Sequence, residues 1–122
     1  MTARCVLIVE DDIDSREALA DALIDAGYTV EVAPEGRSAL RRLLEAERMP
    51  DLVLLDLMMP ELDGYGLLSE MNNDVRLAQI PTVLLSASPG ARAPTPNVRA
   101  FLLKPVHLDK LLAAVTKYAA QA

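Results

Sequence analysis

The sequence contains very few aromatic residues: three tyrosines, one phenylalanine and no tryptophan among 122 residues. A hydrophobic core must therefore be built mainly from leucine, valine, isoleucine and alanine. Hydrophobic residues make up 52% of the chain and charged residues 25%, which is typical of a globular protein and excludes an intrinsically disordered one. The length fits a single domain over residues 1–122.

Cysteine, basic charge and long apolar runs are also scarce. The single cysteine, Cys5, excludes an intramolecular disulfide, and its place in an apolar run predicts burial. The formal net charge of −6 argues against direct nucleic-acid binding, which needs a basic face. No run approaches the length of a membrane span, and residues 1–9 lack a signal-peptide pattern. We therefore expect a cytoplasmic protein that binds neither nucleic acid nor membrane.

What the chain does contain is a regular alternation of short apolar runs and amphipathic segments. The runs that predict strands are residues 4–9, 29–33, 51–56, 81–86 and 99–103. The segments with apolar residues at helical spacing are residues 14–26, 39–44, 64–71 and 108–119. This alternation predicts an α/β fold: a doubly wound, five-stranded parallel sheet with helices on both faces.

The connection between the fourth and fifth predicted strands departs from this rhythm. Residues 88–98 contain three prolines and a glycine. Each proline inside a helix costs about 3 kcal/mol. We therefore expect the fourth helix of the alternation to be short or absent, replaced by a loop or about one turn.

Polar residues stand where four of the predicted strands end. Asp11 and Asp12 follow the first strand, Asp56 ends the third, Ser86 ends the fourth and Lys104 follows the fifth. Because the carboxyl ends of parallel strands meet at one edge of the sheet, these side chains should converge there. Three carboxylates in one crevice repel each other unless a cation or a proton intervenes. A hard divalent ion such as Mg²⁺, which takes oxygen ligands, answers that requirement.

Lys104 and Ser86 supply the complementary chemistry. An ammonium group opposite a metal-bound carboxylate can hold phosphoryl oxygens, and a hydroxyl group can donate a hydrogen bond to another of them. A carboxylate such as Asp56 can itself be the nucleophile and form an aspartyl-phosphate. Positioning and charge neutralisation do most of the catalysis in such transfers. The constellation therefore predicts a phosphoryl-transfer site.

Taken in order, these motifs resemble the receiver domain of two-component response regulators. The matching motifs are Glu10-Asp11-Asp12, Asp56 with Met58-Met59-Pro60 and Asp63-Gly64, Ser86-Ala87, and Lys104-Pro105. The match covers nearly the whole chain at close to the family's spacing. It implies a flavodoxin-like sheet with the strand order 2-1-3-4-5.

The resemblance also implies a role for each acidic residue. Asp56 would be the phosphoacceptor, taking phosphate from a phosphohistidine on a histidine kinase or a histidine phosphotransfer protein. Asp12, Asp56 and the backbone carbonyl of Met58 would bind Mg²⁺ directly, and Asp11 would act through water.

The remaining residues would carry the response to phosphorylation. Lys104 would contact the phosphoryl group, Ser86 would move toward it, and the rotamer of Phe101 would follow Ser86. The Lys104–Pro105 peptide is expected to be cis, as in the family. The domain would thereby act as a two-state switch that controls a downstream partner.

Two other functions fit part of the constellation. A phosphatase of the haloacid dehalogenase type also uses a strand-end aspartate with Mg²⁺ and a lysine, but it needs a second aspartate where this chain has Met58. An inert pseudo-receiver used only for binding would have lost an acidic residue, Asp56 or Lys104, and all are present. We therefore interpret the chain as a signalling domain that is no enzyme beyond self-catalysed phosphoryl transfer and slow autodephosphorylation.

Met58 also yields a kinetic prediction. In the family, the residues two beyond the phosphoacceptor and two beyond the switch hydroxyl, here Met58 and Ser88, flank the path of the hydrolytic water. A long apolar side chain offers that water no hydrogen bond, so phosphate should be lost slowly. Met58→Asn should shorten the half-life of the phosphoprotein, measured as loss of phosphate over time. An unchanged half-life would contradict the idea.

Overall fold

The computed structural model describes residues 3–57, 63–87 and 95–120, which contain five strands and four α-helices. The strands are β1 (Cys5–Val9), β2 (Thr29–Ala33), β3 (Leu52–Asp56), β4 (Thr82–Ser86) and β5 (Val98–Leu103). The helices are α1 (Ile13–Asp25), α2 (Gly36–Glu45), α3 (Gly64–Asn72) and α4 (Leu108–Ala119), with a short 3-10 turn at Leu77–Gln79. All strand pairs are parallel, in the order β2-β1-β3-β4-β5, which confirms the predicted fold class.

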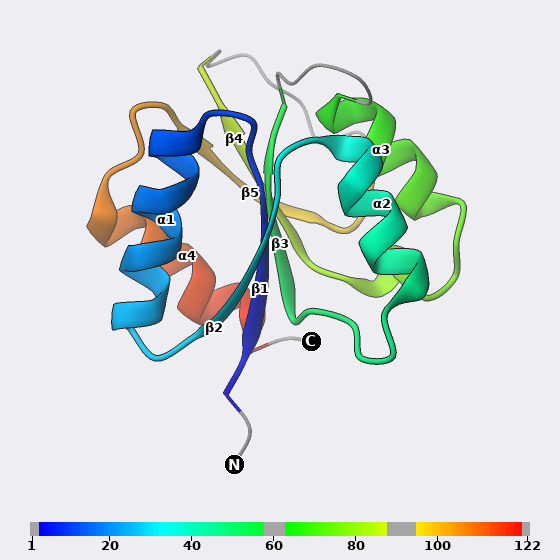
Figure 1. Cartoon of the computed structure of the whole chain (residues 1–122), viewed down its shortest axis with the longest axis horizontal. Helices are drawn as coiled ribbons and strands as arrows, with labels where there is room; N and C mark the ends of the chain where they lie inside the picture. Colours follow the sequence, from blue (N-terminus) through cyan, green and yellow to red (C-terminus); the bar gives the residue numbers. More distant parts are fainter. Residues whose placement is uncertain (1–2, 58–62, 88–94, 121–122) are drawn as a thin grey trace.

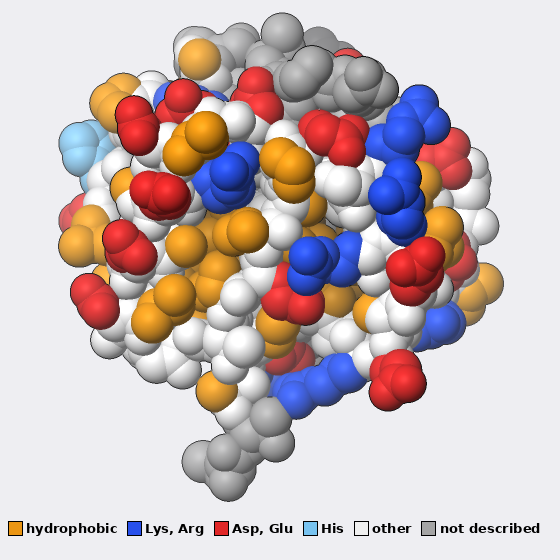
Figure 2. Space-filling view, viewed as in Figure 1, with side chains coloured by type: hydrophobic (Ala, Val, Ile, Leu, Met, Phe, Trp, Pro, Cys, Tyr) orange, Lys and Arg blue, Asp and Glu red, His pale blue; other side chains and the backbone are white. Residues whose placement is uncertain are grey.

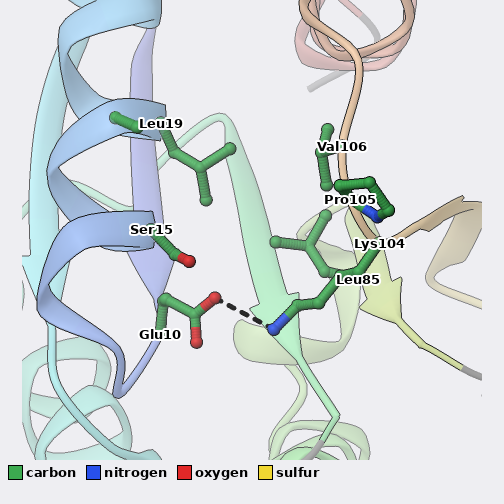
Figure 3. A pocket seen from close by; sticks show the side chains of 8 residues that line it. Glu10, Ser15, Leu19, Leu85, Lys104, Pro105 and Val106 are labelled. Carbon is green, nitrogen blue, oxygen red and sulfur yellow. Dashed lines mark hydrogen bonds and ion pairs between the residues drawn. The ribbon is translucent and has the colours of Figure 1, made fainter.

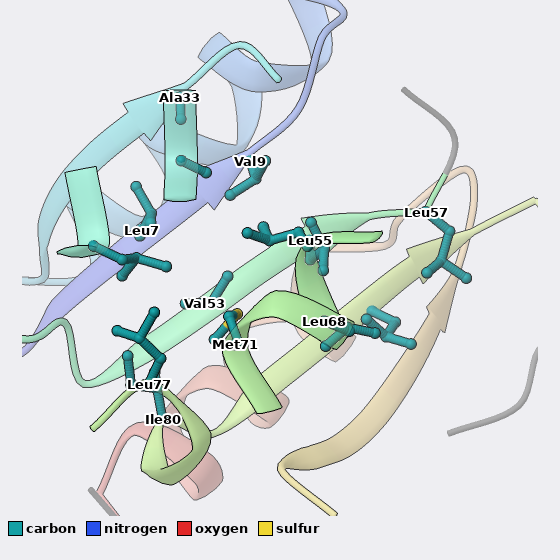
Figure 4. Close-up of a cluster of buried hydrophobic side chains, with 14 residues drawn as sticks. Leu7, Val9, Ala33, Val53, Leu55, Leu57, Leu68, Met71, Leu77 and Ile80 are labelled. Carbon is teal, nitrogen blue, oxygen red and sulfur yellow. The ribbon is translucent and has the colours of Figure 1, made fainter. Parts of the chain in front are cut away.

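The sheet separates two hydrophobic layers, because successive side chains of a strand point to opposite faces. Helices α1 and α4 cover one face, and α2 and α3 cover the other (Figure 1). On the second face, Leu7 of β1 and Leu55 of β3 pack among Leu43, Leu68 and Met71 of the helices (Figure 4). Strands β1, β3 and β4 are thus buried on both faces. Their carboxyl ends form the edge where the polar residues lie.

The connection before β5 is described only from residue 95, and residues 95–97 form a turn. Residues 88–94, where the short or absent helix was predicted, lie outside the described residues. Asn97 anchors the turn: its buried amide donates to the carbonyl of Ile80 at 3.3 Å and to Thr82 Oγ1 at 3.4 Å. The backbone N–H of Thr82 donates to the carbonyl of Asn97 at 2.8 Å. These bonds fix the start of β5 beside β4.

Charge is unevenly distributed over the surface. Residues 11–25 contain six carboxylates and a single arginine, so α1 and the turn before it carry most of the net negative charge of the chain. Figure 2 shows acidic side chains over the α1 side of the molecule and basic side chains over the α2 side. None of the described helices combines the length and the apolar character needed to cross a membrane. Cys5 is half-buried rather than buried, and burial raises the pKa of its thiol.

Candidate functional site

The ends of β1, β3 and β5 meet at an ion-pair cluster centred on Lys104. The Lys104 Nζ lies 3.1 Å from Glu10 Oε1 and 3.2 Å from Asp56 Oδ2. Asp56 is the last residue of β3 and is 3% exposed, while Lys104 directly follows β5. The predicted convergence of Asp56 and Lys104 at one sheet edge is therefore observed. One ammonium group bridges carboxylates from two strands.

Glu10 is a site residue to which the sequence analysis gave no role. It continues the buried run of β1 and is fully buried, with its backbone N–H donating to the carbonyl of Ala33 at 3.1 Å. The Arg16 Nη1 donates to the Glu10 carbonyl at 3.1 Å and holds the backbone from the other side. The sequence contained one signal, because Glu10 is the first of three consecutive acids and directly continues an apolar strand.

The buried carboxylates form a cluster with one exposed neighbour. Glu10, Asp11 and Asp56 each offer a carboxylate oxygen, and these three atoms lie within 4.8 Å of one another. Glu10 Oε1 accepts a hydrogen bond from Lys104, whereas the buried Glu10 Oε2 has no hydrogen-bond partner in the described part of the chain. A buried carboxylate oxygen left without a donor is costly. The cluster therefore has the oxygen ligands of a cation site, and it contains a buried carboxylate oxygen that a bound cation would stabilise.

The surroundings raise the pKa values of both Glu10 and Lys104. Burial, reinforced by the nearby Asp56, raises the pKa of Glu10 from its ordinary 4.5 to about 7, although the bond to Lys104 acts in the opposite direction. Burial alone would lower the pKa of Lys104, but its bonds to Glu10 and Asp56 outweigh this and raise it. Lys104 therefore stays charged at neutral pH, and Glu10 titrates near neutrality.

Asp12 lies outside this cluster because it begins a helix. It is exposed, and its Oδ2 accepts a hydrogen bond from the backbone N–H of Ser15 at 2.9 Å, as an N-cap residue does. The bond to Ser15 lowers the pKa of Asp12. The structure thus gathers Glu10, Asp11 and Asp56, whereas the predicted group was Asp11, Asp12 and Asp56.

Of the other predicted residues, Ser86 lies at the same edge, whereas Phe101 lies inside β5. Ser86 ends β4 and is 5% exposed, and its carbonyl accepts the backbone N–H of Lys104 at 2.9 Å. The Lys104–Pro105 peptide is cis, as predicted. Phe101 lies in β5 beside Leu84 and is 37% exposed. Met58 falls outside the described residues, so its carbonyl cannot be placed.

The start of α3 packs tightly against the end of β3. Asp63 caps the helix by accepting the backbone N–H of Gly66 at 2.8 Å. A Cβ atom on Gly64 would lie 2.6 Å from the Cα of Leu57 and 2.7 Å from the carbonyl oxygen of Asp56. Only glycine allows this approach. The Asp-Gly pair of the motif thereby fixes the backbone on which the Asp56 side chain stands.

A largely apolar hollow of about 440 Å³ opens beside the Glu10–Lys104 pair. Figure 3 shows it between α1, which contributes Ser15 and Leu19, and the segment after β5, which contributes Pro105 and Val106. Leu85 of β4 forms part of its lining. The ion pair forms the polar end of this hollow, so the reactive edge is bordered by an apolar surface.

Comparisons with known proteins agree with this arrangement. Residues 6–116 match the family model described as "Response regulator receiver domain". The chain is 38% identical over 115 residues to the sensor histidine kinase TmoS of Ectopseudomonas mendocina, covering 91% of this chain and 12% of that one. It is 37% identical over 112 residues to the response regulator MprA of Mycolicibacterium vanbaalenii, covering 88% of this chain and 47% of that one. The chain thus spans less than half the length of these relatives.

Among solved structures, the fold is similar to that of the signal receiver domain of a signal transduction histidine kinase from Syntrophus aciditrophicus. The TM-score is 0.84 at 30% sequence identity, and the superposition covers 98% of this chain and 92% of that one.

Proposed function

The chain belongs to the response regulator receiver domain family, whose members are phosphoacceptors in two-component signalling, and we propose that it accepts a phosphoryl group on the carboxylate of Asp56. The observation that carries the proposal is the Lys104 ammonium, 3.2 Å from Asp56 Oδ2 at the carboxyl end of the sheet. A fixed positive charge beside a carboxylate nucleophile is positioned to neutralise the charge on an incoming phosphoryl group.

The donor is a phosphohistidine on a histidine kinase or on a histidine phosphotransfer protein. An oxygen of Asp56 bonds to phosphorus as the bond between phosphorus and the donor nitrogen breaks, which leaves an aspartyl-phosphate and a histidine. Lys104 then shifts part of its interaction from Asp56 to the phosphoryl oxygens while Glu10, 3.1 Å away, keeps it in place. The Ser86 hydroxyl donates to a phosphoryl oxygen, and Phe101 changes rotamer with it.

The acidic cluster fits Mg²⁺, because it offers only oxygen ligands and contains a buried oxygen without a donor. We assign the ion to Glu10, Asp11 and Asp56, and the carbonyl of Met58 is a further candidate from the family resemblance. Asp12 remains a predicted ligand only by that resemblance, since its carboxylate caps α1. When bound, the ion supplies positive charge that screens the carboxylates from each other and from the phosphoryl group.

The two assignments for the acidic residues can be separated by neighbouring substitutions. Asp11→Asn should weaken Mg²⁺ binding by about tenfold or more, because it removes a charged ligand of the cluster. Asp12→Asn should leave the affinity within about twofold, because asparagine is also a good N-cap residue. Isothermal titration of both variants with MgCl₂ measures this. The opposite order of affinities would restore Asp12 as the ligand.

The function itself is tested by incubating the chain with a small-molecule phosphodonor such as acetyl phosphate, with Mg²⁺ or with EDTA. The expected product carries the mass of one added phosphoryl group, is stable to acid and labile to base, and forms only when Mg²⁺ is present. A chain that gains no such phosphate in the presence of Mg²⁺ would contradict the proposal.

A further inference from the structure

Arg16 is the one basic residue of an acidic stretch, and its guanidinium is bonded to the backbone. Residues 11–25 contain six carboxylates and a single arginine. Among the described residues, no carboxylate forms an ion pair with Arg16. Its half-buried side chain instead donates from Nη1 to the carbonyl oxygen of Glu10 at 3.1 Å. The contact is therefore part of the turn that leads from β1 into α1.

The carbonyl of Glu10 needs a donor from outside the sheet. Glu10 is fully buried, and its N–H donates to the carbonyl of Ala33 in β2 at 3.1 Å. In a parallel ladder, the carbonyl of the same residue would accept an N–H two positions further along that strand. Strand β2 ends at Ala33, so the ladder does not continue that far. A buried carbonyl without a donor is destabilising, and Arg16 supplies the missing hydrogen bond.

The peptide group that Arg16 holds joins two members of the acidic cluster. It links Glu10 to Asp11, whose carboxylate oxygens lie within 4.8 Å of each other and of an oxygen of Asp56. Because a peptide group is planar, fixing its orientation restricts the backbone dihedral angles on both sides and thus the directions of both side chains. Arg16 is itself anchored, since its backbone N–H donates to the carbonyl of Asp12 at 2.9 Å. The first turn of α1 therefore sets the orientation of both carboxylates.

We propose that Arg16 is a positioning residue for the Mg²⁺ ligands, because its guanidinium fixes the peptide group between Glu10 and Asp11 and so keeps their carboxylates together. Mg²⁺ demands near-ideal ligand geometry, and groups that orient its ligands contribute strongly to its affinity. The positive charge of Arg16 acts in the opposite direction, because like charges repel. The inference rests on the proposed cation site at Glu10, Asp11 and Asp56, and it adds a residue that belongs to α1.

Arg16→Met separates positioning from charge, because the two effects change the affinity in opposite directions. The variant loses both the charge and the donor, and methionine is as favourable in a helix as arginine. Positioning predicts that the affinity for Mg²⁺ falls by about tenfold. Loss of the charge alone would raise that affinity. Isothermal titration with MgCl₂, without a phosphodonor, measures the change, and equal or tighter binding by the variant would overturn the proposal.

Two further variants and a metal-free measurement exclude a general loss of stability. Arg16→Lys keeps a donor and the charge, and its affinity should lie within about threefold of the original. Glu17→Gln changes the charge of an exposed neighbour and should alter the affinity by less than about twofold. In EDTA, Arg16→Met should speed amide hydrogen exchange at Glu10 by about fivefold or more and leave Leu54 in β3 unchanged. Equal acceleration at both amides, or a lysine variant as weak as Arg16→Met, would show a merely structural role and contradict the inference.

The rate of phosphoryl incorporation from acetyl phosphate gives an independent test when the Mg²⁺ concentration is varied. In Arg16→Met, the half-saturating Mg²⁺ concentration should rise by about tenfold, while the rate at saturation stays within about threefold of the original. A lower rate at saturation with the same half-saturating concentration would place Arg16 in the transfer step and overturn its role toward the ligands. If the original chain bound no Mg²⁺, the cation site would be wrong as well, which distinguishes that failure from a failure of Arg16 alone.

Discussion

Asp56→Asn is expected to abolish phosphoryl incorporation while the fold is retained. An amide oxygen is a poor nucleophile compared with a carboxylate, so no aspartyl-phosphate can form at this position. Asparagine has nearly the same shape as aspartate and can stand in a site that is 3% exposed. The second contact of Lys104, to Glu10 at 3.1 Å in the original chain, does not involve residue 56. The loss is measured as the fraction of chains that carry a phosphoryl group after incubation with acetyl phosphate and Mg²⁺.

Asp51→Asn is the matched control. Asp51 precedes the same strand at its opposite end, where its Oδ2 accepts the backbone N–H of Cys5 at 2.7 Å. An asparagine oxygen can accept that bond too, and the residue is far along the strand from the reactive edge. Phosphorylation of this control should equal that of the original chain. If Asp56→Asn still gained a base-labile phosphate, another carboxylate of the cluster would be the acceptor and the assignment of Asp56 would be wrong.

The sequence predicted best those parts of the molecule in which one secondary structure clearly fits the pattern of apolar residues. Short apolar runs between turn signals, such as Val53–Leu55, indicate buried strands, and parallel strands bring their carboxyl ends together. The position of Asp56 beside Lys104 was therefore expected from the pattern. The fold class was predicted in the same way, whereas the order of the strands came from the family resemblance.

The acidic turn after β1 was harder because three consecutive carboxylates compete for different tasks. The sequence pattern predicts a first helix from residue 14, whereas α1 begins at Ile13 and takes Asp12 as its N-cap. Oδ2 of Asp12 accepts the N–H of Ser15, and the acids whose oxygens gather with Asp56 at the sheet edge are Glu10 and Asp11. Which acids reach the sheet edge depends on where β1 ends to within one residue, and sequence propensity does not determine that boundary. The buried Glu10 is thus a consequence of tertiary packing.

Glu10→Gln is expected to stabilise the metal-free protein at alkaline pH. The pKa of Glu10 is raised from 4.5 to about 7 on folding, so the folded state binds the proton more tightly than the unfolded state does. Below the unfolded pKa both states are protonated, and the group has no effect on stability. As the pH rises from 4.5 through 7, the folded protein loses stability, by at most about 3 kcal/mol. Glutamine stays neutral at every pH, so the variant does not lose this stability.

The experiment compares urea unfolding of the original chain and of Glu10→Gln at pH 5 and pH 8 in EDTA. The variant should be more stable at pH 8 by roughly 1–3 kcal/mol and should show a smaller difference at pH 5. Glu17→Gln, at an exposed position of α1, is the control and should change the free energy of unfolding by less than about 0.5 kcal/mol at either pH.

Two opposing effects decide the sign of this result. The ion pair with Lys104 at 3.1 Å favours the charged Glu10, whereas burial and the proximity of Asp56 disfavour it. In buried pairs the cost of removing charges from water can exceed their attraction, and the raised pKa of Glu10 indicates that it does so here. With Mg²⁺ in place of EDTA, the original chain should become the more stable of the two at pH 8. A cation bound to the folded state neutralises the carboxylates and stabilises the fold, and Glu10→Gln binds that cation more weakly. A variant that is less stable at pH 8 in EDTA would show that the Lys104 pair outweighs burial.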